Sequence, residues 1–261
     1  MCIAGSVGRN GKNDRADTKI VQVLLNANAS RFDLGEPLAE DGLYGSRTES
    51  GIRAFHVGVL GAANPELRVD PGGRALAALA EGLPRELDTR ALQGIMAHSS
   101  SERVERYARP LIERMAANGI DSARRRRHFL AQIGHESGGL RYTEELASGD
   151  AYEGRIDLGN TEPGDGPRFK GRGLIQLTGR ANYAAYGAEV GLDLLGDARE
   201  SLSHDPLRAV DVACWFWRAH GLNALADRDD LEAVTRRLNG GLNGLDDRAA
   251  YLERARFFVR D

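Results

Sequence analysis

The pattern of apolar positions predicts helices along most of the chain. Residues 17–27 carry an apolar stripe at helical spacing, and a second stripe runs over 48–59 at intervals of three and four residues. A third helix is expected from about Pro71, a favourable first-turn residue, to Ala80. Residues 1–86 should therefore form a small three-helix domain.

A short segment rich in Gly and Pro then predicts a linker, Glu81-Gly-Leu-Pro-Arg-Glu86. Residues 87–261 would form a second domain, whose first helix is capped by Asp88 or Thr89. The next helix should span 101–117, with Pro110 kinking or splitting it. Further helices are expected from Arg180, around Trp217, over 231–238 and over 246–259.

The helix that begins near Arg124 carries the most informative pattern. Phe129, Ile133 and Glu136 lie at i, i+4 and i+7 and so share one face. Ser137-Gly-Gly139 follows directly. A carboxylate that continues an apolar stripe should face a pocket or cleft, because burying an unpaired charge is costly. Partial desolvation and the negative end of the helix dipole both favour the protonated form that a general acid needs.

Helical periodicity fails between residues 147 and 173, where Gly, Pro, Asp and Asn dominate. Long loops in compact domains are often functional, and this one can also hold a short strand or two. The fold class predicted is therefore mainly α: a three-helix domain, then an α-helical domain with a long loop or small β element.

Composition restricts the function without identifying it. The chain is 41% hydrophobic and 28% charged, and its net charge is −3. No basic field recruits nucleic acid, and Arg124–Arg127 would spread over several helix faces toward solvent. No run approaches the ~20 apolar residues of a membrane span, and the N-terminus lacks the apolar stretch of a signal peptide. We expect no membrane insertion, synthesis in the cytoplasm, free thiols at Cys2 and Cys214, and a monomer.

Several chemistries fail on spacing. His135-Glu136 would need a second His at the position of Gly139 to form a zinc protease motif. Arg168–Gly173 lacks the Gly-x-x-x-x-Gly-Lys-Ser/Thr pattern of a phosphate-binding loop. There is no metal-ligand set and no Gly-x-Ser-x-Gly motif. We therefore expect no cofactor and no metal.

Paired carboxylates remain. Glu145 lies nine residues after Glu136, beyond the glycine turn that lets the chain form the opposite wall of a cleft. Glycoside hydrolysis uses two carboxyl groups that flank the scissile bond. Glu136 would then be the proton donor and Glu145 the ionised partner, with the adjacent Glu144 as the competitor for the second role.

The first domain resembles the peptidoglycan-binding domain found beside many cell-wall hydrolases. The resemblance rests on Val21-Gln22, Leu24-Leu25-Asn26 and Asp41-Gly-x-x-Gly45-x-x-Thr48-x-x-x-Ile52-x-x-Phe55. The family usually has Gln after the Phe, where this chain has His56. The resemblance implies that residues 1–86 bind peptidoglycan.

Residues from about 88 onward resemble the family 19 glycoside hydrolases, which have a chitinase-like fold of lysozyme type. Four blocks occur in order: Ala131-Gln-Ile-Gly-His-Glu136-Ser-Gly-Gly139, Phe169-Lys-Gly-Arg-Gly173-Leu-Ile-Gln176-Leu-Thr178, Trp215-Phe-Trp217 and Leu238-Asn239-Gly-Gly241. The resemblance implies an inverting enzyme with Glu136 as general acid, Glu145 as general base and Thr178 holding the attacking water.

The same resemblance implies four substrate-contacting positions: Gln176, Asn182, Asn239 and, on weaker correspondence, Arg248, as a cleft arginine that pairs with a catalytic glutamate. For Gln176 and Asn239, structural capping of loops is the alternative.

The chain lacks the disulfides of plant chitinases, and its segment between the two glutamates is shorter. It is therefore more similar to bacteriophage endolysins, in which such a domain follows a peptidoglycan-binding domain. The expected function is a peptidoglycan hydrolase that acts as a muramidase on the cell wall after the membrane has been permeabilised. A chitinase, an N-acetylglucosaminidase, a lytic transglycosylase and a non-catalytic wall-binding module are the alternatives.

Overall fold

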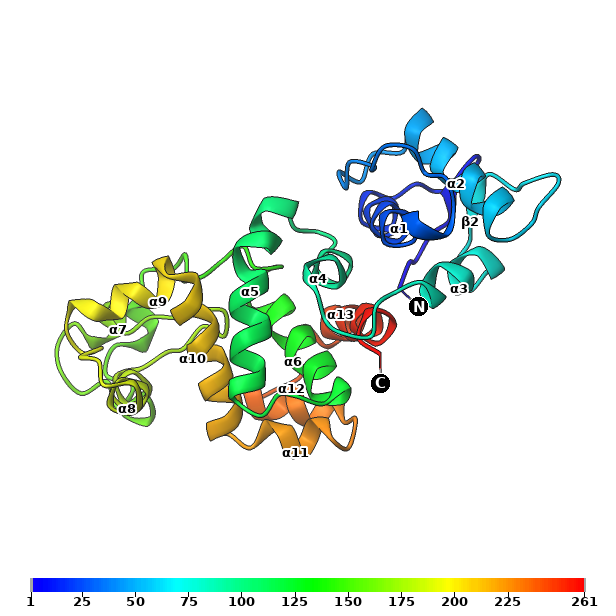
Figure 1. The fold of residues 1–261 in the computed structure, drawn as a ribbon. Helices are drawn as coiled ribbons and strands as arrows, with labels where there is room; N and C mark the ends of the chain where they lie inside the picture. Colours follow the sequence, from blue (N-terminus) through cyan, green and yellow to red (C-terminus); the bar gives the residue numbers. More distant parts are fainter. Residues whose placement is uncertain (1, 261) are drawn as a thin grey trace. The chain divides into compact units, whose positions relative to one another are not determined.

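The computed structural model describes residues 2–260, and these are mainly α-helical, as predicted (Figure 1). Contacts between Cα atoms divide the chain into two compact units. Unit 1 contains the described residues up to Glu105 together with those from Ala249 onward, and unit 2 is Arg106–Arg248. The division expected from the sequence, into a wall-binding domain at 1–86 and a catalytic domain at 87–261, is defined by function and stays a prediction.

Unit 1 contains the three helices expected near the N-terminus and a small sheet that the apolar pattern did not indicate. Its elements are β1 (Val7–Gly8), α1 (Arg15–Ala27), the 3₁₀ turn η1 (Ala29–Arg31), α2 (Ser46–Gly58), β2 (Arg68–Val69), α3 (Arg74–Glu81) and α4 (Thr89–Ile95). β1 pairs antiparallel with β2, with Val7 opposite Val69. Strands of two residues are too short to produce a detectable alternation.

The predicted start of the third helix was wrong. Pro71 lies in the turn before α3, and the helix begins three residues later, at Arg74. The Pro71-Gly72-Gly73 sequence explains the difference, because Gly72 has φ of +69°, which is left-handed backbone that a helix does not contain.

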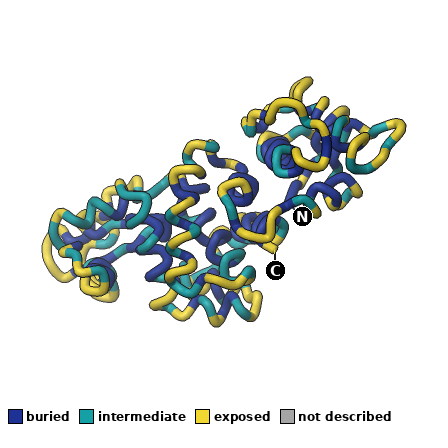
Figure 2. Tube along the Cα trace, in the orientation of Figure 1, coloured by how far each residue is buried: buried dark blue, intermediate teal, exposed yellow. Residues whose placement is uncertain are grey.

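Helix α4 belongs to unit 1 because it packs against α1. Asp88 caps it as predicted, its carboxylate accepting a hydrogen bond from the backbone N–H of Ala91 at 2.7 Å. Figure 2 shows α1 as a largely buried helix, and its residues 17–25 are all buried. Phe55 from α2 contributes a fully buried ring to the same core.

Unit 2 is mainly helical, with a long segment of loops and short helical turns between α6 and α8. It contains most of α5 (Ser101–Ala117), then α6 (Ala123–Glu136), η2 (Asp150–Tyr152), η3 (Ile156–Leu158), α7 (Asp165–Arg168), α8 (Arg180–Val190), η4 (Asp197–Glu200), α9 (Ser201–His204), α10 (Pro206–Ala219), α11 (Leu222–Ala226), α12 (Leu231–Asn239) and the start of α13 (Leu245–Phe258). Pro110 lies inside α5 without splitting it.

The core of unit 2 lies where α6, α10, α11 and α12 pack together. Phe129 of α6 and Trp217 of α10 are fully buried, and their rings meet edge to face at 5.4 Å. The indole N–H of Trp217 donates to the side-chain oxygen of Asn223 at 2.8 Å, so the buried polar atom has a partner. Trp217 therefore packs in the core of unit 2, and its contact with Phe129 fixes α6 so that the last residue of this helix, Glu136, has a defined position.

The long loop after residue 147 is ordered by short elements and one buried ion pair. The carboxylate of Asp165, 1% exposed, accepts two hydrogen bonds from the guanidinium of Arg180 at 2.6 and 2.7 Å. The hydrogen bonds from Arg180 lower the pKa of Asp165, and partial burial of the carboxyl group opposes this effect without cancelling it. Isolated antiparallel bridges join Glu144 to Arg172 and Arg172 to Leu177. These bridges are the small β element that was expected.

Candidate active site

Glu136 is the last residue of α6, a helix with clear signals at both ends. Ser122 caps its N-terminus by accepting from the N–H of Arg125 at 3.3 Å. Beyond Glu136 the chain reverses through Gly138 and Gly139, at φ of +57° and +72°. These left-handed conformations favour glycine, so the Ser-Gly-Gly sequence is what ends the helix at this point.

The carboxylate of Glu136 is mostly buried, with 18% of the side chain exposed, and it is held by Arg248. Arg248 is 1% exposed and donates from Nη2 to Oε1 of Glu136 at 2.5 Å. Its other nitrogens donate to the side-chain oxygen of Gln132 and, at 3.3 Å, to the carbonyl of Asn243. Among the described residues, the second oxygen of Glu136, Oε2, has no hydrogen-bond partner.

The expected pairing between Arg248 and a catalytic glutamate is present, but it changes the electrostatics expected for Glu136. A guanidinium stabilises the ionised carboxylate, which opposes the effects of burial and of the helix end. A protonated carboxyl can keep the same contact, because Oε1 can accept from Arg248 while Oε2 carries the proton. Arg248 thus directs the acidic proton of Glu136 to the oxygen that has no protein partner.

Gly244, just before α13, and Asp247, in its first turn, both contact the end of α6 beside the Glu136–Arg248 pair. His135 contacts Asp247 through Nδ1 and Oδ2 at 2.7 Å. Gly244 has φ of +70°, and a Cβ atom placed on it would lie 2.1 Å from the His135 ring. The close packing of the Gly244 backbone on the imidazole gives His135 and Gly244 a structural role.

Glu145 lies in the segment that forms the small β element, and among the described residues its carboxylate has only neutral hydrogen-bond partners. The backbone N–H of Gly171 donates to Oε2, and the hydroxyl of Tyr152 donates to Oε1, both at 3.1 Å. Its own N–H donates to the carbonyl of Gly171 at 2.9 Å. Partial burial and the adjacent carboxylate raise the pKa of Tyr152, so its hydroxyl stays protonated and can donate.

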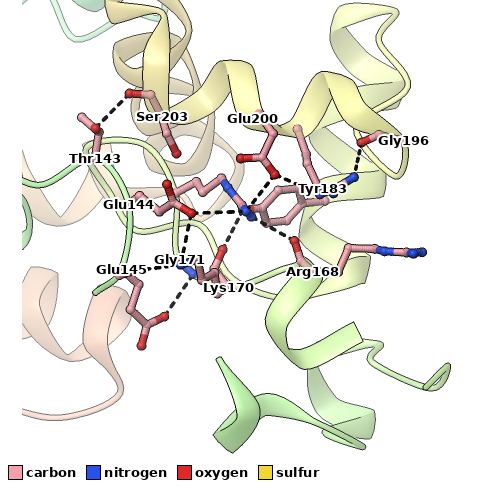
Figure 3. A network of polar contacts seen from close by, with 12 residues as sticks. Thr143, Glu144, Glu145, Arg168, Lys170, Gly171, Tyr183, Gly196, Glu200 and Ser203 are labelled. Atoms are coloured by element: carbon pink, nitrogen blue, oxygen red, sulfur yellow. Dashed lines mark hydrogen bonds and ion pairs between the residues drawn. The ribbon is translucent and has the colours of Figure 1, made fainter. Parts of the chain in front are cut away.

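The neighbouring Glu144 points into a different set of contacts (Figure 3). Its carboxylate lies 3.1 Å from Nζ of Lys170 and 3.4 Å from the guanidinium of Arg172. Arg172 also reaches Glu200 at 3.0 Å. Glu144 is therefore neutralised by two cations, whereas Glu145 is an ionisable group with hydrogen-bond donors and no cation. This arrangement favours Glu145 over Glu144 as the base.

Arg172 organises the surroundings of the second carboxylate. It is 4% exposed and donates to the carbonyl of Arg168 at 2.9 Å and to the hydroxyl of Tyr183 at 3.1 Å. Burial raises the pKa of Tyr183 to about 12, so it remains neutral, and its hydroxyl donates to the carbonyl of Lys170 at 2.7 Å. These contacts fix residues 168–172, including the N–H of Gly171 that holds Glu145.

The four other polar candidates lie in unit 2 but divide into two places. Thr178 donates to the carbonyl of Gln176 at 2.9 Å, and Asn182 donates to the carbonyl of Thr178 at 2.7 Å. Gln176 has φ of +55° and donates to the carbonyls of Gly173 and Tyr142. These three residues form one local group beside the Glu145 segment.

Asn239 is the fourth and ends α12, donating to the carbonyl of Asn243 at 3.3 Å. It therefore belongs with the Arg248 segment. The side-chain amides of Gln176, Asn182 and Asn239 all bond to backbone carbonyls, which is the loop-capping alternative stated for two of them. Their roles toward substrate stay predictions.

The sequence patterns did not indicate three residues that position the two glutamates. Tyr152 contacts Glu145, Gln132 contacts Arg248, and Arg172 supports the segment that carries Gly171. A signal existed for Arg172, in the Gly-Arg-Gly block, and for Gln132, in the block that ends at Gly139. The sequence did not give the partner of either residue, because Arg172 contacts α8 and η4 and Gln132 contacts Arg248. Tyr152 lies in a loop where neither periodicity nor spacing marks it.

The part of the chain that the structure describes holds no group of three or more His, Cys, Asp and Glu side chains suited to a metal ion. Among the described helices, none has both the length and the apolar composition of a membrane span.

Comparison with known sequences gives a consistent family. The model of a family described as class I chitinase, glycoside hydrolase family 19, matches residues 115–226. A glycosyl hydrolase family 19 domain-containing protein of Haemophilus influenzae is 36% identical over 151 residues, which cover 46% of this chain and 72% of that protein. An endochitinase of Arabidopsis thaliana is 39% identical over 113 residues, 43% of this chain and 38% of that protein.

Solved structures agree on the fold. Chitinase C from Streptomyces griseus matches with a TM-score of 0.54 and 21% identity, over 66% of this chain and 91% of that chain. A family 19 class IV chitinase from Zea mays matches with a TM-score of 0.53 and 22% identity, over 65% and 91%. At this identity the likeness concerns the fold alone.

Proposed function

The chain belongs to glycoside hydrolase family 19 and is a glycosidase, and we propose that it cleaves the β-1,4 bonds of the bacterial cell-wall glycan as a muramidase. The observation that carries the proposal is the unequal environment of two carboxylates in unit 2. Glu136 ends a buried helix and contacts Arg248, whereas the carboxylate of Glu145 has only neutral donors within the described part of the chain. Two carboxyl groups in unlike environments are what acid–base hydrolysis of a glycoside requires.

In the proposed mechanism Glu136 donates the proton on Oε2 to the glycosidic oxygen as the bond to the anomeric carbon breaks. Glu145 accepts a proton from a water that attacks this carbon from the opposite face, which inverts its configuration. Tyr152 and the N–H of Gly171 orient Glu145 for this step, and Thr178 holds the water. Arg248 keeps Oε1 of Glu136 occupied, so that Oε2 faces the substrate. No cofactor takes part.

Two features support peptidoglycan as the substrate. Only eight residues lie between Glu136 and Glu145. This is a shorter segment than plant chitinases have, and we infer that it leaves a more open cleft. The motif from Asp41 to Phe55 resembles a peptidoglycan-binding domain. Domains of that family occur beside many cell-wall hydrolases, where they would hold the hydrolase on peptidoglycan. We infer a phage endolysin that is made in the host cytoplasm, acts as a monomer and reaches the periplasmic wall once the membrane has been permeabilised.

A second candidate is chitin hydrolysis. The relatives with printed activities are chitinases, and chitin shares the β-1,4 linkage and the N-acetyl groups of the wall glycan. A chitinase would use the same two glutamates, so the site alone supports both substrates. Cleavage on the other side of N-acetylglucosamine, an N-acetylglucosaminidase activity, is a third outcome on the same fold.

Mass spectrometry of products from purified peptidoglycan tests the proposal. A muramidase leaves N-acetylmuramic acid at the new reducing end, and incubation in H₂¹⁸O labels that end. N-acetylglucosamine at the reducing end would indicate the glucosaminidase, and anhydro-sugars would indicate a lytic transglycosylase. Turnover of chitin oligomers without turnover of peptidoglycan would refute the wall assignment. Glu136→Gln serves as the inactive control.

A further inference from the structure

Unit 1 contains a pocket of about 540 Å³ that belongs to neither glutamate. It lies between the first half of α1, the turn at residues 40–41, and the segment 97–101 that leads into α5. The volume is within the range of about 300–1,000 Å³ typical of ligand sites. We name it the Lys19 pocket after the side chain that distinguishes it.

Lys19 is a buried cation without a carboxylate partner. It is 4% exposed, and its ammonium donates to the carbonyl of Ser99 at 2.6 Å. Among the described residues it has no other hydrogen bond and no ion pair. An ammonium has three donors, so two remain unfilled at the wall of a pocket. Burial lowers the pKa of Lys19, with the nearby Glu40 opposing this effect. An unpaired buried charge is costly unless a ligand completes it.

Two further positive features line the same pocket. Arg15 lies one turn before Lys19 on α1 and uses only its Nε, which donates to the carbonyl of Asp41 at 3.2 Å. Its terminal nitrogens have no partner within the described chain. The N-terminus of α5 reaches the pocket at Ser100 and Ser101, and the first N–H groups of a helix attract anions. Together these groups suit a carboxylate.

The pocket also contains two acidic side chains, which are held by neutral donors. Glu40 accepts from the side chain of Asn26 at 3.0 Å, and Asp41 accepts from that of Gln22 at 3.0 Å. In the described residues neither carboxylate forms an ion pair with Lys19 or with another cation. Positive and negative side chains therefore line the same pocket without forming ion pairs with one another. A ligand that carries both a carboxylate and an ammonium complements both.

We propose that the Lys19 pocket binds a short peptide through its terminal carboxylate and an ammonium group. Lys19, Arg15 and the N-terminus of α5 hold the carboxylate, and Glu40 and Asp41 hold the ammonium. A stem peptide of peptidoglycan carries both groups, a C-terminal carboxylate and the side-chain ammonium of its diamino acid. D-alanyl-D-alanine is the smallest probe that carries a carboxylate and an ammonium, and the assignment of the stem peptide as the natural ligand rests on the proposed function. The pocket would then add recognition of the wall peptide to cleavage of the wall glycan.

The test is a titration of the full chain with D-alanyl-D-alanine, followed by calorimetry and by NMR shifts of residues lining the pocket. N-acetyl-D-alanyl-D-alanine lacks the ammonium, and D-alanyl-D-alanine amide lacks the carboxylate, so each should bind about tenfold more weakly or worse. Lys19→Met should weaken the dipeptide by about ten- to a hundredfold. Arg15→Gln changes an exposed side chain and is the second variant if Lys19→Met unfolds. Arg53→Gln, exposed on α2 outside the pocket, is the matched control.

The proposal is overturned if the dipeptide does not bind, if neither Lys19→Met nor Arg15→Gln weakens it, or if both analogues bind as well as the parent. Turnover of peptidoglycan and of chitin oligomers is measured on the same preparations. Binding of the dipeptide by a protein that cleaves only chitin would refute the proposed function and leave the pocket assignment standing. Cleavage of peptidoglycan by a protein that does not bind the dipeptide would refute the pocket assignment and leave the proposed function standing.

Discussion

Replacing the two adjacent glutamates one at a time tests the structure's distinction between them. Glu145→Gln removes the group that would take a proton from water, while a glutamine can still accept from the N–H of Gly171 and donate to the oxygen of Tyr152. The loss of a general base lowers turnover by about 100- to 10,000-fold, or about 2.7–5.5 kcal/mol of barrier. The lost charge should lower stability by only about 1 kcal/mol, because the donors that hold the side chain are neutral.

Glu144→Gln should have the opposite profile. Glu144 is one-third exposed and pairs with Lys170 and Arg172, and Arg172 keeps a second carboxylate, Glu200, at 3.0 Å. Because the buried guanidinium stays paired, the expected loss is about 1 kcal/mol of stability. Turnover should fall by less than about tenfold, since a small displacement of the Glu145 segment is the only route to the site.

The assay measures initial rates on soluble N-acetylated oligosaccharides and on purified peptidoglycan, with thermal unfolding of each variant as the control for folding. A loss of 1 kcal/mol corresponds to a shift in Tm of about 2–4 °C in a chain of this size. If Glu144→Gln loses more turnover than Glu145→Gln at equal stability, the assignment of the base from hydrogen-bond partners is wrong.

Three other perturbations follow from the same contacts. Glu136→Gln should lower turnover by about 100-fold or more and should also cost about 2–3 kcal/mol of stability, since Gln can still accept from Arg248 but leaves this buried guanidinium without a carboxylate; residual turnover above one-tenth of the wild-type rate in the folded variant would exclude it as the acid. Asp165→Asn should destabilise the chain by about 2–3 kcal/mol at pH 7, because Arg180 loses its partner. The folded-state pKa of Asp165 is lowered, so its contribution is fully present above its unfolded pKa and is lost as pH falls through the folded value. Unfolding curves of wild type and variant should therefore converge in acid, and a gap that stays constant would contradict the ion pair. Gly244→Ala should lower both stability and turnover, since its Cβ would meet the His135 ring at 2.1 Å. Gly240→Ala, at φ of +74° with open space around it, is the control for backbone strain. Equal losses of stability and turnover in the two variants would show that the contact between Gly244 and the His135 ring has no effect of its own.

Much of the fold could be predicted because its determinants are local. The helices α1, α6 and α12 start and end within two residues of their expected limits, since apolar spacing and capping residues act within a few turns. The predictions failed where structure depends on partners far along the chain. The β1–β2 pair joins residues about sixty apart. The start of α3 was missed for a local reason, since the left-handed Gly72 keeps Pro71 in the turn before the helix.

The candidate site divides in the same way. Glu136 could be identified from its helix face and the glycines after it, because both are properties of adjacent residues. The contact with Arg248 joins residues 112 positions apart. It depends on the packing of α12 on α6 and on the contacts that Asp247 and Arg248, in the first turn of α13, make with the end of α6. The glutamates 144 and 145 are equivalent in sequence terms. Their partners differ because residues 170–172 lie beside this segment. Lys170 and Arg172 place two cations beside Glu144, and Gly171 places a peptide N–H beside Glu145.

The sequence alone therefore determined the family resemblance, the helices and the pair of glutamates, because motif spacing and periodicity are carried by neighbouring residues. Tertiary structure decided which oxygen of Glu136 is available, which of two adjacent carboxylates has no cation, and that Lys19 is a buried charge at the wall of a pocket. Each of these depends on charges and donors brought together across long sequence separations. Electrostatic environment is a property of distance in space, which position in the sequence does not fix.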